Sequence, residues 1–326
     1  MTGADPIVRM DGARKSFGAT RAVDGLSLDV GRGEMFGVIG PDGAGKTTAL
    51  RLICGLLKPD AGTVRVKGVD PFVNRREAAR TMGYVSQRFS LYGDLSIDEN
   101  IEFFARIHGV RDFAARRSRL LQLTGLEPFR GRLADRLSGG MKQKLALACV
   151  LVHEPPVLVL DEPTTGVDPV SRREFWKLLA EFLQQGLTIV MATPYLDEAE
   201  RCGRVALIAA GRVLAQDEPA KLQAAAAGQL IEVVAGKPRQ ALEVVRAQIG
   251  PDRVQLFGDR LHVRVDDESE FAPVRDAMAK AGMPVTEWRR IAHTLEDVFI
   301  DRLAHAPAAP AAATEAAAHA QPEKRP

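Results

Sequence analysis

A glycine-rich segment that ends in a lysine and two threonines is the clearest chemical pattern in the sequence. It follows the apolar run 35–39 and precedes residues 49–57, which have helical spacing. In a strand–loop–helix context, a G-x-x-x-x-G-K-[ST] loop binds phosphate through backbone N–H groups, its lysine and its hydroxyl, which can also bind Mg²⁺. The alternative is a chance glycine-rich turn. We predict a nucleoside triphosphate site made by Gly40, Asp42, Gly43, Ala44, Gly45, Lys46, Thr47 and Thr48.

Two carboxylates, Asp161 and Glu162, end a second apolar run that starts at Val157. An uninterrupted apolar run suits a central strand that is covered on both faces, and the carboxyl edge of such a sheet is where α/β proteins bind ligands. One carboxylate can hold Mg²⁺ while the other orients water for attack on a γ-phosphate. The alternative is a solvent-exposed strand end without a chemical role.

Two further patterns are ambiguous by themselves. Phe17 follows an alternating segment and is either a core aromatic residue or a ring that stacks on an adenine base. Ser138, Gly139 and Gly140 precede a helix that is expected to run to about Val152. They form either a second anion cradle or an ordinary loop with a serine cap.

The other expected elements surround these residues. Segments 7–10, 26–30 and 62–68 predict a small antiparallel sheet, and 82–87, 187–193 and 205–208 predict buried strands, with Gln87 at the end of the first. Helices are expected at 97–107, where 98–100 form the cap, and at 112–125 and 170–185. From Gly228 the alternating segments 230–234 and 261–265 and the helical segments 238–249 and 269–281 predict a small α+β appendage. Residues 305–326 are Ala/Pro-rich and are expected to be disordered.

The composition narrows the class of protein. Lys+Arg 44 against Asp+Glu 42 gives a net charge of +2, which offers no electrostatic argument for a nucleic-acid partner. Cys54, Cys149 and Cys202 are far apart and suggest neither a metal site nor a disulfide framework, which fits a reducing cytosol. No apolar run reaches the roughly 18 residues that span a bilayer, and residues 1–9 lack a signal-peptide core. We therefore expect a soluble protein whose membrane role depends on a partner.

Along the chain, the motifs occur in the order phosphate loop, strand-end Gln87, Ser-Gly-Gly at 138–140, the carboxylate pair at 161–162, and Gly-Val-Asp at 166–168. This order resembles that of the nucleotide-binding subunit of ATP-binding-cassette (ABC) transporters. The resemblance covers about residues 5–225 and is specific, because no other P-loop class carries a Ser-Gly-Gly motif between the two phosphate-site elements. It implies an α/β P-loop NTPase fold with a parallel core sheet, an antiparallel β subdomain and a helical signature subdomain. The expected limits are 5–225 for the ATP-binding domain, 228–304 for the α+β accessory domain and 305–326 for the tail.

The resemblance also implies roles for single residues. Phe17 would stack on the adenine of ATP. Catalysis would depend on Lys46, Gln87 and Glu162, with Glu162 as the general base, and Mg²⁺ would be bound by Thr47, Gln87 and Asp161. Ser138, Gly139 and Gly140 would close over the γ-phosphate bound by a second nucleotide-binding subunit, which Asp168 also contacts. The working unit would then be a homodimer or a heterodimer.

Finer features resemble the ABC-2 type, drug-export-like branch. Met141 stands at the fifth signature position in place of the usual glutamine, and residues 294–299 resemble the terminal Leu-Glu-Asp-Val-Phe motif of that branch. This implies an ATPase that powers export through a separate ABC-2 type permease, cytoplasmic and peripheral on the inner face of the cell membrane. Residues 88–110 would contact the coupling helix of that permease. Alternatives are a non-transport ABC ATPase and a regulatory ATP-binding module without turnover.

Two positions depart from the family pattern. Asp42 stands where asparagine is usual in the phosphate loop, with a mild expected effect because the backbone holds the phosphates. Pro194 stands where the family usually has a histidine that senses the γ-phosphate, and proline has neither a side-chain donor nor a backbone N–H. Two interpretations remain: another donor replaces the histidine, or this chain is the weak half of an asymmetric pair.

Overall fold

The computed structural model describes residues 5–87 and 91–304. The chain divides into two compact units, which contain residues 5–216 and 217–304 of the described part. The two units are treated separately below. The division lies nine residues before the expected limit at 225. The expected disordered tail, 305–326, lies outside the described residues, as does part of the expected permease-contacting segment, at 88–90.

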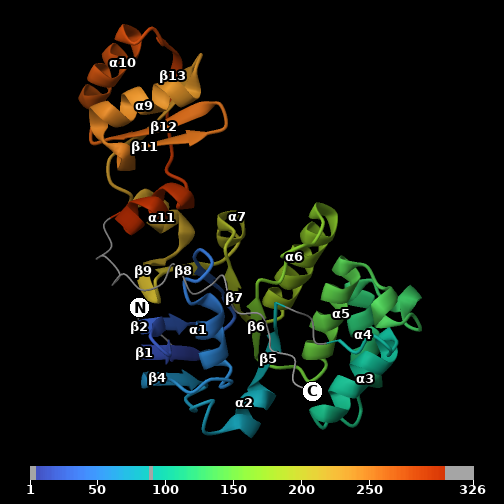
Figure 1. Cartoon of the computed structure of the whole chain (residues 1–326). Helices are drawn as coiled ribbons and strands as arrows, with labels where there is room; N and C mark the ends of the chain where they lie inside the picture. Colours follow the sequence, from blue (N-terminus) through green and yellow to red (C-terminus); the bar gives the residue numbers. More distant parts are fainter. Residues whose placement is uncertain (1–4, 88–90, 305–326) are drawn as a thin grey trace, which may run out of the picture. The chain divides into compact units, whose positions relative to one another are not determined.

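The first unit contains a small antiparallel sheet with the strand order β2-β1-β4 (Figure 1). Val8 pairs with Val30 on one side and with Val66 on the other, so the apolar positions of all three strands share one face. This sheet was expected from the alternating pattern. Its strands are β1 (Val8–Phe17), β2 (Thr20–Val30) and β4 (Ala61–Val66).

The second sheet of this unit has the order β5-β6-β7-β3-β8-β9, and its first five strands run parallel. Asp161 pairs with Ala192, and Ile39 pairs with Thr193, so the ends of β6, β7 and β3 meet at one edge. The phosphate loop, the two carboxylates and the Pro194 segment all start from that edge. The strands are β3 (Met35–Ile39), β5 (Met82–Val85), β6 (Val157–Asp161), β7 (Thr188–Thr193), β8 (Arg204–Ala209) and β9 (Arg212–Asp217).

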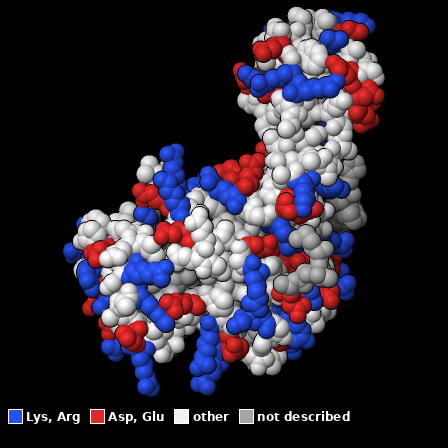
Figure 2. Space-filling model, turned by 180° about the vertical axis from the view of Figure 1, so that it is seen from behind, with Lys and Arg blue, Asp and Glu red and all other residues white. Residues whose placement is uncertain are grey.

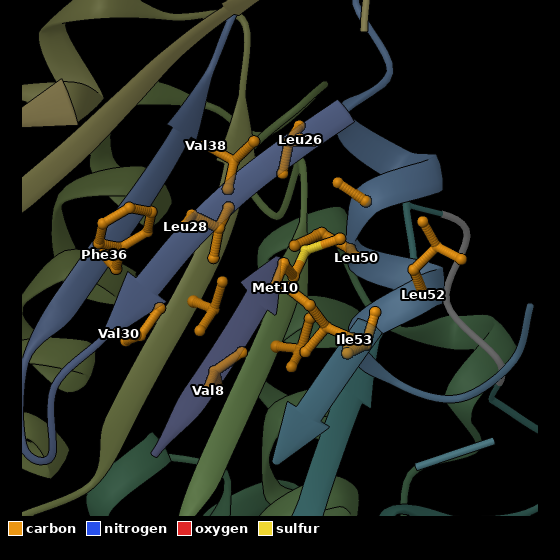
Figure 3. Close-up of a cluster of buried hydrophobic side chains, with 14 of the residues drawn as sticks. Val8, Met10, Leu26, Leu28, Val30, Phe36, Val38, Leu50, Leu52 and Ile53 are labelled. Atoms are coloured by element: carbon orange, nitrogen blue, oxygen red, sulfur yellow. The ribbon is translucent and has the colours of Figure 1, made fainter. Parts of the chain in front are cut away.

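Helix α1 (Lys46–Ile53) packs between the two sheets. Figure 3 shows its Leu50 and Ile53 directed toward Met10 of β1 and toward the side chains of β2 and β3. All of these side chains are buried, and each contributes about 1.5–3 kcal/mol to folding by leaving water. The first turn of α1, which carries Lys46 and Thr47, is thereby fixed against the sheet edge.

Of the remaining helices of the first unit, α3, α4, α5 and α6 were expected from the sequence, whereas the short helices α2 and α7 were not. One local detail was wrong: the cap of α3 is Ser96 rather than residues 98–100, because Ser96 Oγ accepts from Glu99 N at 3.2 Å and Glu99 Oε2 accepts from Ser96 N at 2.8 Å. The helices are α2 (Arg75–Thr81), α3 (Ile97–Ile107), α4 (Ala114–Thr124), α5 (Gly139–Leu151), α6 (Pro169–Gln184) and α7 (Leu196–Ala199), with 3₁₀ turns at Glu127–Phe129 and Ala134–Arg136.

The second unit is a four-stranded antiparallel sheet, ordered β11-β12-β10-β13, with its own apolar core. The element sequence β-α-β-β-α-β and this order are those of a ferredoxin-like fold. Its elements are α8 (Pro219–Ala224), β10 (Gln229–Ala235), α9 (Pro238–Ile249), β11 (Val254–Phe257), β12 (Arg260–Val265), α10 (Phe271–Lys280), β13 (Val285–Ile291) and α11 (Leu295–Ala304), with 3₁₀ turns at Pro251–Arg253 and Glu268–Glu270. Of the helices within residues 5–87 and 91–304, none combines the length and apolarity needed to cross a membrane.

Candidate active site

The phosphate loop turns sharply between β3 and α1. Gly45 has φ of 99°, and a Cβ atom there would lie 2.2 Å from the backbone oxygen of Ala22, so only glycine fits. The ammonium of Lys46 is 4% exposed and donates to the carbonyl oxygens of Gly40 at 2.9 Å and Pro41 at 3.0 Å. The loop therefore holds a buried cation at the N-terminus of a helix, an arrangement suited to phosphate.

Asp161 is fixed on both carboxylate oxygens. Thr47 Oγ1 donates to its Oδ1 at 3.0 Å, and the Tyr84 hydroxyl donates to its Oδ2 at 3.0 Å. Burial and the negative charge of Asp161 raise the pKa of the Tyr84 hydroxyl, which keeps it protonated as a donor. The Thr47 and Asp161 oxygens are the donor type that Mg²⁺ prefers, so these residues fit that ion.

Glu162 lies between Lys46 and Gln87, the two other residues for which the family resemblance implies a catalytic role. Its Oε1 is 3.4 Å from Lys46 Nζ, and its Oε2 accepts from Gln87 Nε2 at 2.9 Å. Its φ of 48° is unusual for a residue with a side chain and is strained by about 1–3 kcal/mol. Strain of this kind persists only where the surroundings enforce it, and here it aims the carboxylate at the phosphate loop.

Ser138, Gly139 and Gly140 start α5, where Ser138 Oγ accepts from Met141 N at 3.3 Å. A Cβ atom on Gly140 would lie 2.4 Å from Ser171 Oγ, so α6 packs directly on this glycine. Within the described residues, no hydrogen bond joins these three residues to the phosphate loop. They are connected to the catalytic edge through buried Gln143, which donates to the carbonyl oxygen of Pro163, next to Glu162.

Phe17 ends β1 and is 50% exposed, so the core-aromatic interpretation of this residue is wrong. It pairs with Thr20 across the β1–β2 hairpin, whose Ala22 lies against Gly45 of the phosphate loop. An exposed ring on this hairpin is compatible with adenine stacking.

Two further motif residues face solvent. The side chain of Asp42 is 93% exposed, with Oδ1 3.6 Å from Lys46 Nζ. Asp168 caps α6 by accepting from Val170 N at 3.0 Å and Ser171 N at 2.9 Å, and its hydrogen bonds with Ser171 lower the pKa of its carboxyl.

Three residues that position the site were not predicted from the sequence: Tyr84, Gln143 and Glu198. Glu198 is completely buried and accepts hydrogen bonds from Thr164 and Thr193. Each connects segments far apart in the chain, so no local spacing reveals them. The sequence signal that could have identified these three residues was a polar side chain inside or beside an apolar segment.

Comparison with known proteins supports this description. A family model described as ABC transporter matches residues 23–165. The chain is 41% identical over 303 residues to the probable multidrug ABC transporter ATP-binding protein YbhF of Escherichia coli (strain K12), over 92% of this chain and 52% of YbhF. It therefore spans about half the length of that relative. It is 37% identical to the daunorubicin resistance ATP-binding protein DrrA3 of Streptomyces coeruleorubidus, over 91% of this chain and 96% of that protein.

The fold is similar to that of solved cassettes. A dimeric bacterial ABC transporter cassette matches with a TM-score of 0.59 and 25% sequence identity, over 65% of this chain and 98% of that one. The near-complete match to DrrA3, together with a phosphate loop, paired carboxylates and a Ser-Gly-Gly helix start in the order of this family, shows that the chain belongs to the ABC transporter ATP-binding proteins.

Proposed function

We propose that this chain binds and hydrolyses ATP and powers the export of a substrate through a separate ABC-2 type membrane permease. The observation that carries the proposal is the convergence of Lys46, Gln87 and Glu162, with Glu162 3.4 Å from the lysine and 2.9 Å from the glutamine. A cation for the phosphates and a carboxylate for water are the two groups that phosphoryl transfer to water needs. The drug-related names of YbhF and DrrA3 favour export.

Hydrolysis would proceed by in-line attack of water on the γ-phosphate. A bond forms between the water oxygen and phosphorus, the bond to the ADP oxygen breaks, and Glu162 accepts the proton of the water. Lys46 neutralises charge on the phosphates, and Gln87 orients Glu162 and the water. Mg²⁺, held by Thr47, Gln87 and Asp161, would supply further positive charge to the phosphates when bound.

The other motif residues define the expected surroundings of the nucleotide. Phe17 would stack on the adenine, and Gly40 to Thr48 would surround the phosphates. Ser138, Gly139 and Gly140 would face the γ-phosphate of a second nucleotide-binding subunit, in a homodimer or a heterodimer. The ATP-binding domain would span 5–225 and the accessory domain 228–304, and the protein would lie in the cytoplasm, bound to the inner face of the membrane through its permease.

No nucleic-acid partner is part of this proposal. Figure 2 shows lysines and arginines interspersed with acidic residues over the face turned to the viewer, which matches the net charge of +2. A protein that binds nucleic acid through its phosphates presents a concentrated basic surface instead.

A second candidate is a catalytically weak or regulatory half of an asymmetric pair, and Pro194 favours it. A proline at this position offers no donor to a γ-phosphate. Such a chain would bind ATP and lend Ser138, Gly139 and Gly140 to the active site of a different partner subunit.

The test is steady-state Mg-ATP hydrolysis by the full chain, with ATP binding measured separately. If the chain hydrolyses ATP, Glu162→Gln lowers turnover at least about a hundredfold while ATP still binds, because the general base is lost. Glu174→Gln, which removes an exposed ion pair between α5 and α6, is the matched control and leaves turnover unchanged. Binding without turnover would favour the second candidate, and Pro194→His would then show whether a histidine restores activity. Absence of ATP binding would refute both.

A further inference from the structure

Glu198 has no role in the proposed chemistry, although both of its carboxylate oxygens accept hydrogen bonds. It lies in α7, four residues after Pro194, and is completely buried. A buried charge is costly unless it is paired and hydrogen-bonded, so the groups that surround it must be held in place.

The first two partners lie where β6 and β7 end, at the carboxyl edge of the sheet. Thr193 Oγ1, which directly precedes Pro194, donates to Glu198 Oε2 at 2.6 Å. Thr164 Oγ1, two residues after Glu162, donates to Glu198 Oε1. One carboxylate thus joins the segment of the general base to the segment where the family places its γ-phosphate sensor.

The third partner comes from α6. Arg172 Nε donates to Glu198 Oε1 at 3.0 Å, and its second nitrogen lies 2.9 Å from the same oxygen and 2.7 Å from Asp197. Arg172 follows Ser171, which packs on Gly140 and is held by the Asp168 cap. The guanidinium therefore connects Glu198 to the helix turn that contacts the signature motif.

We propose that Glu198 is a positioning residue that fixes three segments as one body: the Pro194 loop, the loop after Glu162, and the first turn of α6. This rests on the proposed function. The Pro194 loop and the loop after Glu162 would face the nucleotide of the chain's own site, and the first turn of α6 packs on the signature glycine that would face the nucleotide of the partner's site. A change at one segment is then transmitted to the other two through a single charged group. Glu198 contributes no group to the reaction itself.

Hydrogen exchange on the full-length chain tests the connection without any activity measurement. Glu198→Gln keeps the shape of the side chain but removes its charge and places an amide NH₂ against donors. We expect exchange of the amides in 163–168 and 193–199 to rise together by at least about tenfold, because both lose bonds to the same charged group. Glu174→Gln breaks the ion pair between Lys144 of α5 and Glu174 of α6 and leaves both peptides unchanged.

Two more variants keep the test decisive if Glu198→Gln folds poorly. Thr193→Val removes the donor to Glu198 and the acceptor of Tyr195 N with little change of volume, and it raises exchange in the same two peptides to a smaller extent. As a single variant, Arg172→Gln raises exchange in these peptides. In the double variant with Glu198→Gln it adds little further exchange, since both substitutions remove the same ion pair. Exchange that rises in only one of the two peptides, or equally in Glu174→Gln, would overturn the proposal.

Kinetics separate a positioning role from general stabilisation. In the assembled transporter, Glu198→Gln lowers kcat by about tenfold or more, because the loops that act in the transition state are displaced. KM for ATP stays within about twofold of wild type, because the phosphate loop is intact. Unchanged kcat would refute the positioning role. Failure of the wild-type chain to bind ATP would refute the proposed function instead, and the exchange experiment would still decide whether the three segments are joined.

Discussion

Tyr84→Phe tests whether a hydroxyl outside the recognised motifs fixes the carboxylate proposed to bind Mg²⁺. Tyr84 OH donates to Asp161 Oδ2 at 3.0 Å, and Asp161 is 1% exposed. Phenylalanine keeps the ring and its packing but leaves this carboxylate oxygen without its donor. Thr47 remains bonded to the other oxygen, at 3.0 Å.

The size of the effect follows from the type of bond. A hydrogen bond to a charged group contributes about 1.5–3 kcal/mol, and the buried acceptor has little water to replace it. For a unit of about 200 residues, this lowers the midpoint of thermal unfolding by about 3–12 °C. Loss of the partner that orients a metal-binding carboxylate also weakens metal binding by about tenfold or more.

The measurements are thermal unfolding of the chain and the Mg²⁺ concentration at half-maximal ATP hydrolysis. Tyr92→Phe is the matched control, because that ring is largely exposed and keeps its contact with Phe103 in the variant. If Tyr84→Phe and Tyr92→Phe gave the same unfolding midpoint and the same Mg²⁺ dependence, the hydroxyl would not position Asp161 and our reasoning would be refuted.

Two further sets of substitutions test the packing at Gly140 and the electrostatics at His153. Gly140→Ala should destabilise the chain by about 1–3 kcal/mol in chemical unfolding because its methyl group meets Ser171, whereas Gly139→Ala, with open space around it, should not, and Ser171→Gly should rescue Gly140→Ala. Burial and then the charge of neighbouring His108 lower the pKa of His153 from 6.5 to about 4, so its contribution to stability is complete above pH 6.5 and is lost as the pH falls toward 4. His153→Phe, which can still stack on His108, should therefore lose about 2 kcal/mol less stability than wild type between pH 7 and pH 4; equal losses would contradict the pKa shift.

In the first unit, the elements whose apolar pattern lies within one segment were predicted, whereas the short elements α2, α7 and β9 were not. The apolar run before Asp161 and the spacing in 97–107 each lie within a single element, and both elements are present as expected. The helix after the phosphate loop was placed at 49–57 but begins at Lys46. Its first turn carries residues chosen for phosphate binding, and they show no apolar period to mark it.

The positioning residues could not be predicted for a different reason. Tyr84 reaches Asp161 only because β5 and β6 are neighbours in the sheet, and Glu198 reaches Thr164 only because β6 and β7 are neighbours. Strand order is a property of the whole fold. Residue spacing contains none of that information, although it did identify the motif residues that these side chains hold.

The second unit shows where the period-two signal fails. The two central strands, β10 and β12, were expected from alternation, but both edge strands were missed. The strand β11 has only four residues. The strand β13 carries several charged residues, among them Glu287, Arg289 and Arg290. It lies at the edge of the sheet, where charged side chains are tolerated and discourage pairing with other chains. The ferredoxin-like strand order could therefore not be predicted from the two central strands alone.

The substitution at Pro194 removes a donor without loosening the loop that carries it. Thr193 Oγ1 accepts from Tyr195 N at 3.1 Å and donates to Glu198 at 2.6 Å, so the loop is held on both sides of the proline by a hydroxyl that precedes it. None of these bonds needs a side chain at position 194. Any deficit in hydrolysis at this site would therefore be chemical, and a histidine introduced there would enter a loop that is already in place.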